Sequence, residues 1–358
     1  MKKLNVVLLF GGVSSEHEIS CKSAKTIADH LNPHRYEIYK VGITRAGHWL
    51  YYPGPTQLMV DDTWHRQPDC VPCLISPDRT CGGLMLLDDA RTTLPIDVAI
   101  PVLHGKNGED GTMQGLLELA GIAYVGCGVM ASAACMDKVI ANTLMDAAGI
   151  PRCAWSWANR SRCADFASLE QSLAQKLGYP IFVKPANAGS SVGISKAENA
   201  QELQQAIQTA LKEDDKVVFE EFVQGQEIEC AVLGNDQAHS TLPGEILASE
   251  SFYTYEDKYV LGNSSTLIPA RLEPQKLEQV RQLAEKAYLA LGCTGLSRVD
   301  FFVRQKDGAV LLNEINTFPG FTSISMYPQL MEADGLPLPR LLDELIALAL
   351  ERREERHG

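Results

Sequence analysis

Two short apolar segments joined by an Asp-Gly turn place the strongest constraint on how this chain folds. Residues 298–303 and 310–314 both have the composition of β-strands, and Asp307 and Gly308 lie between them. An Asp-Gly pair between apolar runs is a strong signal for a β-hairpin. The sequence therefore predicts an antiparallel pair of strands late in the chain.

Four polar residues lie at alternating positions on this predicted hairpin. Arg298 and Asp300 are on the first strand, and Glu314 and Asn316 are at the end of the second. Because residues two apart project from one face of a strand, a regular register would bring these four side chains together. The side-chain oxygens of Asp300, Glu314 and Asn316 suit a Mg²⁺ ion that also binds substrate phosphates. The arginine could neutralise a phosphoryl group or a developing oxyanion. A solvated hairpin with ordinary surface charges is the alternative, but unpaired charges are costly in apolar surroundings.

The size and charge of the chain exclude several classes of protein. Its 358 residues are enough for two or three domains, with 45% apolar and 22% charged residues. A formal charge of −13 argues against nucleic acid as the main partner. No apolar run is long enough to span a bilayer, and the start MKKLNVVLLFGG reads as a buried strand and turn. We therefore expect a cytoplasmic protein without a membrane segment.

The ten cysteines are scattered along the chain, and in a long cytosolic protein we expect them to be reduced and structural. Cys70, Cys73 and Cys81 form one cluster, but zinc would need a fourth ligand at a recognisable spacing, and none is evident.

The first third of the chain alternates predicted strands with helices. Residues 4–10, 36–43 and 98–103 read as strands, and residues 14–31 as a helix. This alternation indicates an open, mostly parallel sheet. Residues 53–91 are irregular and polar, which is typical of a surface excursion with short strands.

Later changes in the predicted order of helices and strands suggest two further domains. Residues 132–148 have a helical pattern that ends at Gly149 and Pro151, and the strands after Glu227 have an antiparallel pattern. We predict an N-terminal α/β domain, a central domain and a C-terminal domain over residues 1–126, 127–223 and 224–358.

Two glycine-containing segments could bind a nucleotide. Residues 126–131 resemble a dinucleotide-binding turn, but they lie late in the domain and no acidic strand end follows. The stronger signal is Lys184, which ends a strand and precedes a Gly-Ser loop whose backbone N–H groups could cover phosphate oxygens. The strand end at residues 219–223, with Glu227, could receive an adenine and a ribose.

The order of these residues resembles that of ATP-grasp enzymes, and of D-alanine–D-alanine ligases in particular. The resemblance runs from about residue 4 to residue 350. Its motifs are FGGVSSEHEIS, LHGKNGEDGTMQG, ACMDK, KPANAGSSVG, FYTYEDKY and NEINTFPGFTSISMYP.

This resemblance implies an α/β protein with the ATP-grasp fold, in which a central and a C-terminal α+β domain sandwich ATP. It implies ATP-dependent joining of two D-alanines, through an acylphosphate, for peptidoglycan precursor synthesis. Two Mg²⁺ ions, which Mn²⁺ can replace, would be bound by Asp300, Glu314 and Asn316. ATP would be bound by Lys138, Lys184, Ser191, Glu220, Glu221, Phe222, Val223, Glu227 and Asn313.

The resemblance also assigns residues to the amino-acid substrates. Glu16 would anchor the ammonium group of the first D-alanine, with His104 beside its reacting end. Arg298 and the backbone N–H of Gly320 would stabilise an oxyanion. Further assignments are a triad of Glu16 with Ser190 and Tyr259, a second-substrate site at Ser325 and Met326, and Lys258 on a lid at residues 249–265. Taken singly, His104 also fits a structural histidine, Glu16 a helix-start carboxylate and Tyr259 a core residue.

Several alternatives remain open at this point. VGITRAGHW and HGKNGEDG resemble ligases that make D-Ala–D-Ser, whereas Met326 stands where those ligases often carry arginine. The tyrosine-containing lid differs from the histidine lid of D-Ala–D-lactate ligases, and Glu229 resembles dipeptide ligases. A carboxylase subunit would need a carrier-lysine module, which is absent, and an inactive ATP-binding regulator would not need every metal ligand. The sequence does not give the oligomeric state, for which a homodimer is the expectation.

Overall fold

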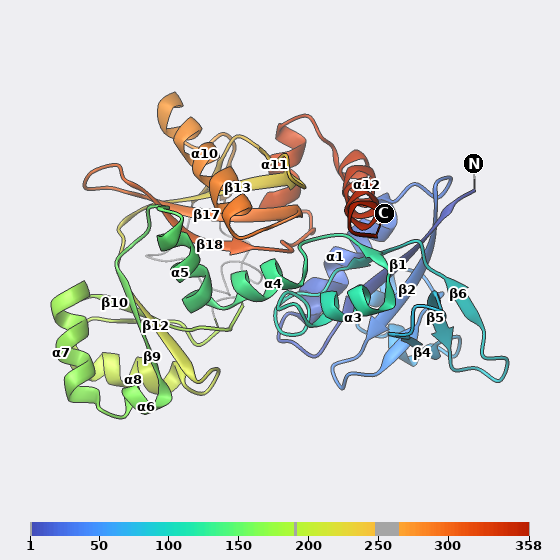
Figure 1. Ribbon diagram of the computed structural model, residues 1–358, viewed down its shortest axis with the longest axis horizontal. Coiled ribbons are helices and arrows are strands. Elements are labelled where there is room, and N and C mark those ends of the chain that lie inside the picture. The colour runs from blue at the N-terminus through green and yellow to red at the C-terminus, as the bar shows by residue number, and fades with distance from the viewer. Residues whose placement is uncertain (1, 190–191, 248–264, 358) are drawn as a thin grey trace.

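The computed structural model describes residues 2–189, 192–247 and 265–357 of the chain. Figure 1 shows three β-sheets with their helices: the N-terminal sheet on the right, a six-stranded sheet in the upper middle and a four-stranded sheet at the lower left. None of the described helices is both long and apolar enough to cross a membrane. The ten cysteines all lie among the described residues, and each is a free thiol.

The N-terminal sheet is mixed, and it is parallel only around its buried centre. Strands β2, β1, β7 and β8 are parallel neighbours, joined through helices α1 and α3, and the remaining strands pair antiparallel. The antiparallel half is built by residues 49–95, which include the stretch 53–91 that the sequence predicts to be a surface excursion with short strands. Short connections can join only antiparallel neighbours, whereas parallel strands need a helical crossover. The elements are β1 (Leu4–Gly11), α1 (His17–His30), β2 (Tyr36–Ile43), β3 (Trp49–Tyr51), α2 (Gln57–Val60), a 3₁₀ turn η1 (Trp64–Arg66), β4 (Val71–Ile75), β5 (Gly83–Leu86), β6 (Thr93–Pro95), β7 (Val98–Pro101), α3 (Thr112–Ala120) and β8 (Ala123–Tyr124).

Residues 132–148, which the sequence predicts to be helical, are divided between two helices by a break at Asp137. Helix α4 (Val129–Met136) ends before Asp137, whose backbone is extended, and α5 (Lys138–Ala147) begins directly after it. The Asp137 carboxylate accepts hydrogen bonds from the first free N–H groups of α5, which is the usual role of an N-cap aspartate. The break places Lys138 in the first turn of α5.

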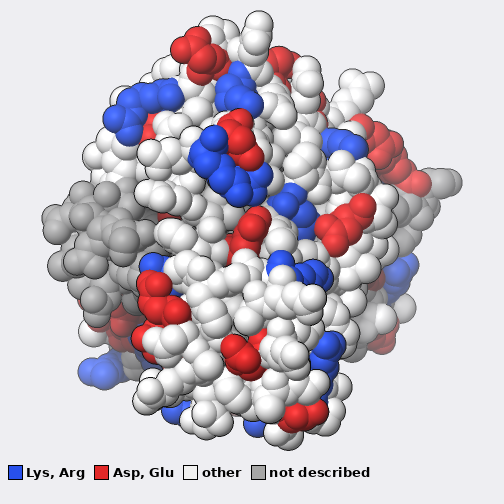
Figure 2. All heavy atoms as spheres, turned by 90° about the vertical axis from the view of Figure 1, so that its left-hand side faces the viewer, with Lys and Arg blue, Asp and Glu red and all other residues white. Residues whose placement is uncertain are grey.

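The four-stranded sheet is antiparallel, in the order β11-β10-β12-β9. Helices α7 and α8 pack on it and enclose a core of their own. Acidic and basic side chains are interspersed over the described part of the face seen in Figure 2, so this face carries no single-sign charge patch there. The elements are β9 (Trp155–Asn159), α6 (Arg160–Cys163), α7 (Phe166–Leu177), β10 (Ile181–Pro185), β11 (Ser195–Ala197), α8 (Ala200–Ala210) and β12 (Lys216–Glu221).

The six-stranded sheet is also antiparallel and contains the hairpin predicted from the sequence. Its path is β16-β15-β13-β17-β18, with β14 paired to β13. The hairpin strands are β17 and β18, so this prediction is confirmed. The elements are β13 (Gly225–Gly234), β14 (His239–Ser240), β15 (Gly244–Leu247), β16 (Ser265–Leu267), α10 (Pro274–Ala290), β17 (Gly295–Arg304), β18 (Val310–Asn316), α11 (Met326–Ala333) and α12 (Leu338–His357).

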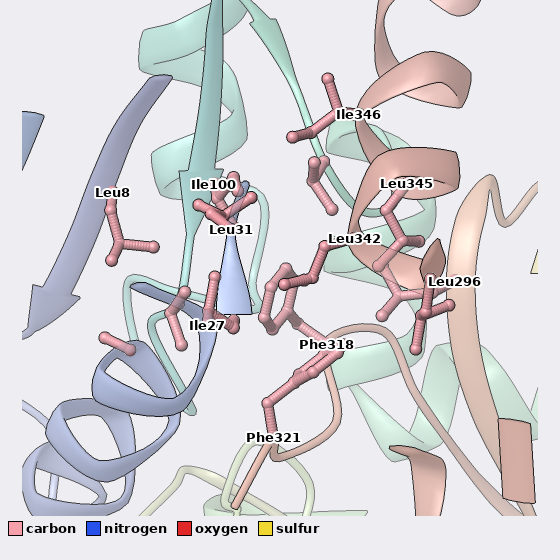
Figure 3. Packing of buried hydrophobic residues seen from close by; sticks show 14 of the residues in the cluster. Leu8, Ile27, Leu31, Ile100, Leu296, Phe318, Phe321, Leu342, Leu345 and Ile346 are labelled. Atoms are coloured by element: carbon pink, nitrogen blue, oxygen red, sulfur yellow. The ribbon is translucent and has the colours of Figure 1, made fainter. Parts of the chain in front are cut away.

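One hydrophobic core joins the N-terminal sheet to the C-terminal part of the chain. In Figure 3, Leu342 and Ile346 of α12 and Phe318 and Phe321 of the loop after β18 belong to the same buried cluster as Ile27 and Ile100. All of these side chains are buried. The loop that follows β18 is therefore held against the N-terminal sheet, whereas the four-stranded sheet keeps a separate core.

Candidate active site

The four polar residues of the hairpin converge as predicted. In the register, Arg298 lies opposite Asn316 and Asp300 lies opposite Glu314. Arg298 donates from Nε to Asp300 Oδ1 at 2.8 Å and from Nη2 to Oδ2 at 2.7 Å. Asn316 Nδ2 donates to the same carboxylate at 2.9 Å. A guanidinium, two carboxylates and an amide therefore share one face of the sheet.

A β-bulge adds a residue to this group. The register shifts after Asp300, so that Phe301 lies opposite Leu312 and Asn313 has no partner across the hairpin. A bulge re-aims the side chain of the extra residue. Here Asn313 Oδ1 accepts a hydrogen bond from Lys184 Nζ at 3.4 Å. The bulge thus links the hairpin to the four-stranded sheet.

The donor set on the hairpin fits a hard divalent cation. Asp300, Glu314 and Asn316 offer only oxygen, which Mg²⁺ and Mn²⁺ prefer over the nitrogen and sulfur donors of a zinc site. Among the described residues, no three His, Cys, Asp or Glu side chains form a metal-binding group. The third donor here is an amide, so a cation at this site would complete its coordination with substrate oxygens and water.

The two predicted phosphate-binding lysines are both buried beside acidic groups. Lys184 Nζ lies 2.6 Å from Glu220 Oε2, and Lys138 Nζ donates to the Ala188 carbonyl at 2.8 Å. Burial lowers the pKa of Lys138. Burial also opposes the charge on Lys184, but Glu220 and then Glu314 outweigh it and hold the pKa of Lys184 above its usual value.

The other residues predicted to bind ATP lie in several different environments. The Glu221 carboxylate accepts from the Ala154 N–H at 3.1 Å and lies 3.5 Å from Arg304, so it joins the two antiparallel sheets. Phe222 stacks on Phe182, with ring centroids 5.9 Å apart. Val223 and Glu227 are partly exposed. Ser190, Ser191, Lys258, Tyr259 and the predicted lid up to residue 264 lie outside the described residues.

Glu16 is enclosed by glycines from two parts of the chain. It is the residue before α1 and is 7% exposed. A Cβ atom added to Gly105 would lie 2.1 Å from Glu16 Oε2, and one added to Gly189 would lie 2.7 Å from it. Any side chain at either position would displace the carboxylate. Both glycines are therefore needed for the carboxylate to reach its position.

His104 joins the N-terminal domain to the loop that follows β18. Its Nδ1 lies 3.1 Å from the Phe318 carbonyl and therefore carries the proton, because a carbonyl can only accept. Its Nε2 can then accept from Ser23 Oγ at 3.4 Å, and Ser23 Oγ in turn accepts from the Phe321 N–H. Burial lowers the pKa of His104 to about 4, so the ring is neutral near neutral pH. Gly320 lies within the loop that these bonds hold.

Glu109 is a site residue to which the sequence assigns no role. Its two carboxylate oxygens accept from the backbone N–H groups of Gly105 at 2.8 Å and Phe318 at 3.2 Å. Burial and the nearby Glu16 carboxylate raise the pKa of Glu109 to about 8. Its place in the HGKNGEDG motif is the only sequence signal that could have identified it.

Glu109 is expected to make stability depend on pH. Its pKa rises from 4.5 to about 8 on folding, so the folded protein keeps a proton that the unfolded chain has released. The stabilisation is complete below pH 4.5 and is lost as pH rises towards 8. As pH rises from about 5 to about 9, the melting temperature of Glu109→Gln should therefore fall less than that of wild type. Melting curves across this range test the difference, with Glu118→Gln on α3 as a control; parallel profiles for wild type and Glu109→Gln would contradict it.

The predicted second-substrate residues lie at the start of α11. Ser325 Oγ accepts from the Thr322 N–H at 3.0 Å, and a Cβ on Gly320 would lie 2.8 Å from it. Met326 is buried, and a Cβ on Gly244 would lie 2.9 Å from its sulfur. The absence of side chains at Gly320 and Gly244 therefore allows both residues to pack closely.

One pocket of about 180 Å³ collects residues from all three sheet regions. Lys184, Glu220 and Asn313 do not line it and form a neighbouring group instead. The residues that line it include Glu16, His104, Glu109, Lys138, Glu229, Arg298, Glu314, Asn316, Gly320, Ser325 and Met326. The pocket thus combines an anionic anchor, cations and oxygen ligands, which is a set suited to phosphoryl transfer onto a small charged substrate.

Comparisons with known proteins cover nearly the whole chain. Residues 5–127 match the family model for the D-ala D-ala ligase N-terminus, and residues 144–347 match the model for its C-terminus. A D-alanine–D-alanine ligase of Caldicellulosiruptor bescii is 48% identical over 99% of this chain and 98% of its own length. One from Acetivibrio thermocellus is 46% identical over 98% and 96%.

Solved structures agree with the sequence relatives. The VanG D-Ala:D-Ser ligase of Enterococcus faecalis superposes with a TM-score of 0.89 at 39% identity, covering 97% of this chain and 100% of that one. The D-alanine–D-alanine ligase of Coxiella burnetii gives a TM-score of 0.86 at 35% identity, covering 99% and 97%. With a mixed N-terminal sheet and two antiparallel sheets in the ATP-grasp arrangement, and with these relatives over its full length, the chain belongs to the D-alanine–D-alanine ligase family.

Proposed function

We propose that this protein uses ATP to join two D-alanines into D-alanyl-D-alanine for peptidoglycan precursor synthesis. The observation that carries the proposal is one pocket in which Glu16, Arg298, Glu314 and Asn316 meet, with Asp300 hydrogen-bonded to Arg298 and Asn316 beside it. Glu16 offers a buried carboxylate to a substrate ammonium group. Arg298 offers a guanidinium to an oxyanion, and Lys138 offers a cation to phosphates.

The chemistry follows from the low reactivity of a carboxylate toward an amine. Transfer of the γ-phosphoryl group of ATP to the first D-alanine turns a carboxylate oxygen into a leaving group and releases ADP. The amine of the second D-alanine then attacks the acylphosphate carbon, and phosphate leaves. Arg298 and the Gly320 N–H would hold the oxyanion of the tetrahedral intermediate. Neutral His104 would fix the loop that carries Gly320 through its hydrogen bond to the Phe318 carbonyl.

Asp300, Glu314 and Asn316 would hold two Mg²⁺ ions, which Mn²⁺ can replace. When bound, such ions neutralise charge on the transferring phosphoryl group. Lys138, Lys184 and Glu220 would orient ATP, and the remaining predicted nucleotide residues would surround its adenine and ribose. A lid over residues 249–265, with Lys258 and Tyr259, would exclude water from the acylphosphate.

We further propose a division into three domains, a cellular compartment and an oligomeric state. We place the domains at residues 1–126, 127–223 and 224–358, a division supported by three sheets that span Leu4–Tyr124, Trp155–Glu221 and Gly225–Asn316. We also propose a cytoplasmic homodimer, because a twofold dimer is the commonest state of soluble oligomers.

A second candidate acceptor is D-serine, which the likeness to the VanG D-Ala:D-Ser ligase favours. D-lactate is a third. The apolar Met326 argues for D-alanine, because its thioether is a poor partner for a serine hydroxyl. Burying an unpartnered hydroxyl costs about 1–3 kcal/mol.

We therefore expect D-alanine to be preferred over D-serine by about tenfold to a hundredfold in kcat/KM. The test is product analysis with D-alanine mixed with equimolar D-serine or D-lactate, in mildly acidic and mildly alkaline buffer, because acid protonates the competing amine. Met326→Leu should keep the preference, and Met326→Gln should raise the D-serine share. Dominant D-Ala–D-Ser, or dominant depsipeptide in acid, would contradict the acceptor assignment alone. No ADP release with any of these acceptors would contradict the ligase proposal.

A further inference from the structure

Arg298 Nε lies beside two carboxylates but has only one hydrogen to give. That hydrogen goes to Asp300 Oδ1 at 2.8 Å. Glu229 Oε2 lies 3.0 Å from the same nitrogen and forms an ion pair with the guanidinium. The side chains of Glu229 and Asp300 are 9% and 11% exposed. Glu229 is therefore close enough to accept the Nε hydrogen with only a small rotation of either side chain.

Glu229 is also part of a row of three acids. It lies directly opposite Asp300 across the β13–β17 pair, and Asp300 lies directly opposite Glu314 across the hairpin. Directly opposed residues on one sheet face have Cβ atoms about 4.5–5.5 Å apart, and like charges at that spacing repel. Arg298 lies two residues before Asp300 on β17 and forms ion pairs with both Glu229 and Asp300. Its positive charge is shared by Glu229 and Asp300.

The two roles proposed for Asp300 compete for the same oxygens. Oδ1 accepts from Arg298 Nε, and Oδ2 accepts from both Arg298 Nη2 and Asn316 Nδ2. These bonds use three of the roughly four lone-pair positions of the carboxylate, so a cation bound through both oxygens would displace a contact of Arg298 or Asn316. If Asp300 turned to the cation, Arg298 would lose this two-bond fork, which helps to fix its guanidinium. A mobile guanidinium would stabilise an oxyanion less well, since such stabilisation depends on groups already held in place.

We propose that Glu229 is a positioning residue that takes over the Nε hydrogen of Arg298 when Asp300 binds the metal. The guanidinium then stays in place while Asp300 is released. This inference rests on the proposed function, because it takes Asp300 as a metal ligand. It assigns Glu229 a role that a static ion pair would not have: it couples metal binding to the position of Arg298.

The test compares Glu229→Gln and Glu229→Asp with wild type. Mn²⁺ binding is measured by electron paramagnetic resonance, with a non-hydrolysable ATP analogue and no D-alanine. Glu229→Gln should weaken Mn²⁺ binding by about tenfold or more, because no carboxylate at position 229 can then take over the Nε hydrogen of Arg298 when Asp300 turns to the metal. At saturating Mn²⁺, its kcat should fall with little change in the KM for ATP, as expected when an interaction of the transition state is lost. Melting curves of the metal-free protein check that each variant is folded.

Glu229→Asp separates a positional role from a purely electrostatic one. It keeps the negative charge but is one methylene shorter and should not reach Arg298 Nε. We expect it to regain little of either the Mn²⁺ affinity or the kcat, because the shorter carboxylate cannot take over the Nε hydrogen. Recovery of both quantities would overturn the proposal in favour of through-space attraction, and so would unchanged Mn²⁺ affinity in Glu229→Gln.

Glu245→Gln on the same sheet serves as the matched control. Glu245 is a buried glutamate that pairs with Arg271 at 2.7 Å, away from the hairpin donors. Its loss should lower the melting temperature without changing Mn²⁺ affinity; an equal loss of affinity would overturn the proposal. Wild-type protein that bound no Mn²⁺ with the nucleotide would overturn the proposed function and this inference together. Normal wild-type binding with an unaffected Glu229→Gln variant would overturn the inference alone.

Discussion

Glu314→Gln should lower kcat by about a thousandfold or more while the fold remains intact, a loss of about 4 kcal/mol of transition-state stabilisation. Glu314 is one of only two carboxylates in the donor set of the hairpin. An amide of the same shape keeps the packing but removes the charge that would hold divalent ions against phosphates. Glu314 also supports the charge on Lys138 and Lys184, the two lysines proposed to bind phosphates, so its loss would weaken the positive charge there.

The measurement is D-alanine-dependent release of phosphate and ADP, together with melting curves. Asp307→Asn is the matched control, because Asp307 is an exposed carboxylate in the turn of the same hairpin and pairs with Arg304. It should leave kcat unchanged. Activity of Glu314→Gln within about tenfold of wild type would remove Glu314 from the metal site.

Lys184→Ala should raise the KM for ATP and lower kcat, with a combined loss of about a hundredfold or more in kcat/KM. The lysine would contact phosphates in both the ground state and the transition state. The substitution should also destabilise the protein, because it leaves the buried Glu220 carboxylate without its partner at 2.6 Å. The nearest remaining cation is Arg152, which lies 4.0 Å from Glu220.

The double variant Lys184→Ala/Glu220→Gln separates these two effects. Removing the charge of Glu220 should restore much of the melting temperature, because no buried carboxylate is then left unpaired. ATP affinity should stay low. If restored stability brought back normal ATP kinetics, Lys184 would be a structural residue and not a phosphate ligand.

The local features of the site could be predicted from the sequence because they depend on short-range rules. The alternation of side chains along a strand and the Asp-Gly turn were sufficient to predict that Arg298, Asp300, Glu314 and Asn316 converge, and the structure confirms it. The order of motifs was sufficient to predict the family, and the relatives confirm it. The roles of individual residues remain predictions, including those of Ser190, Ser191, Lys258 and Tyr259.

Features that depend on contacts between distant parts of the chain were not predicted. Glu109 joins Gly105 to Phe318, more than 200 positions away, as its sequence separation of 209 shows. Ser23 links His104 to Phe321 in the same way. The low pKa of His104 and the high pKa of Glu109 arise from burial, which only packing decides.

The sequence by itself thus determined the hairpin, the fold family and the residue types of the site, because periodicity and turn chemistry are local. Only the tertiary structure decided the break before Lys138, the bulge at Asn313 and the row formed by Glu229, Asp300 and Glu314. Strand pairing brings these residues together from positions that no local pattern relates. The competition of Asp300 and Glu229 for one arginine hydrogen exists only once the two strands β13 and β17 lie in register.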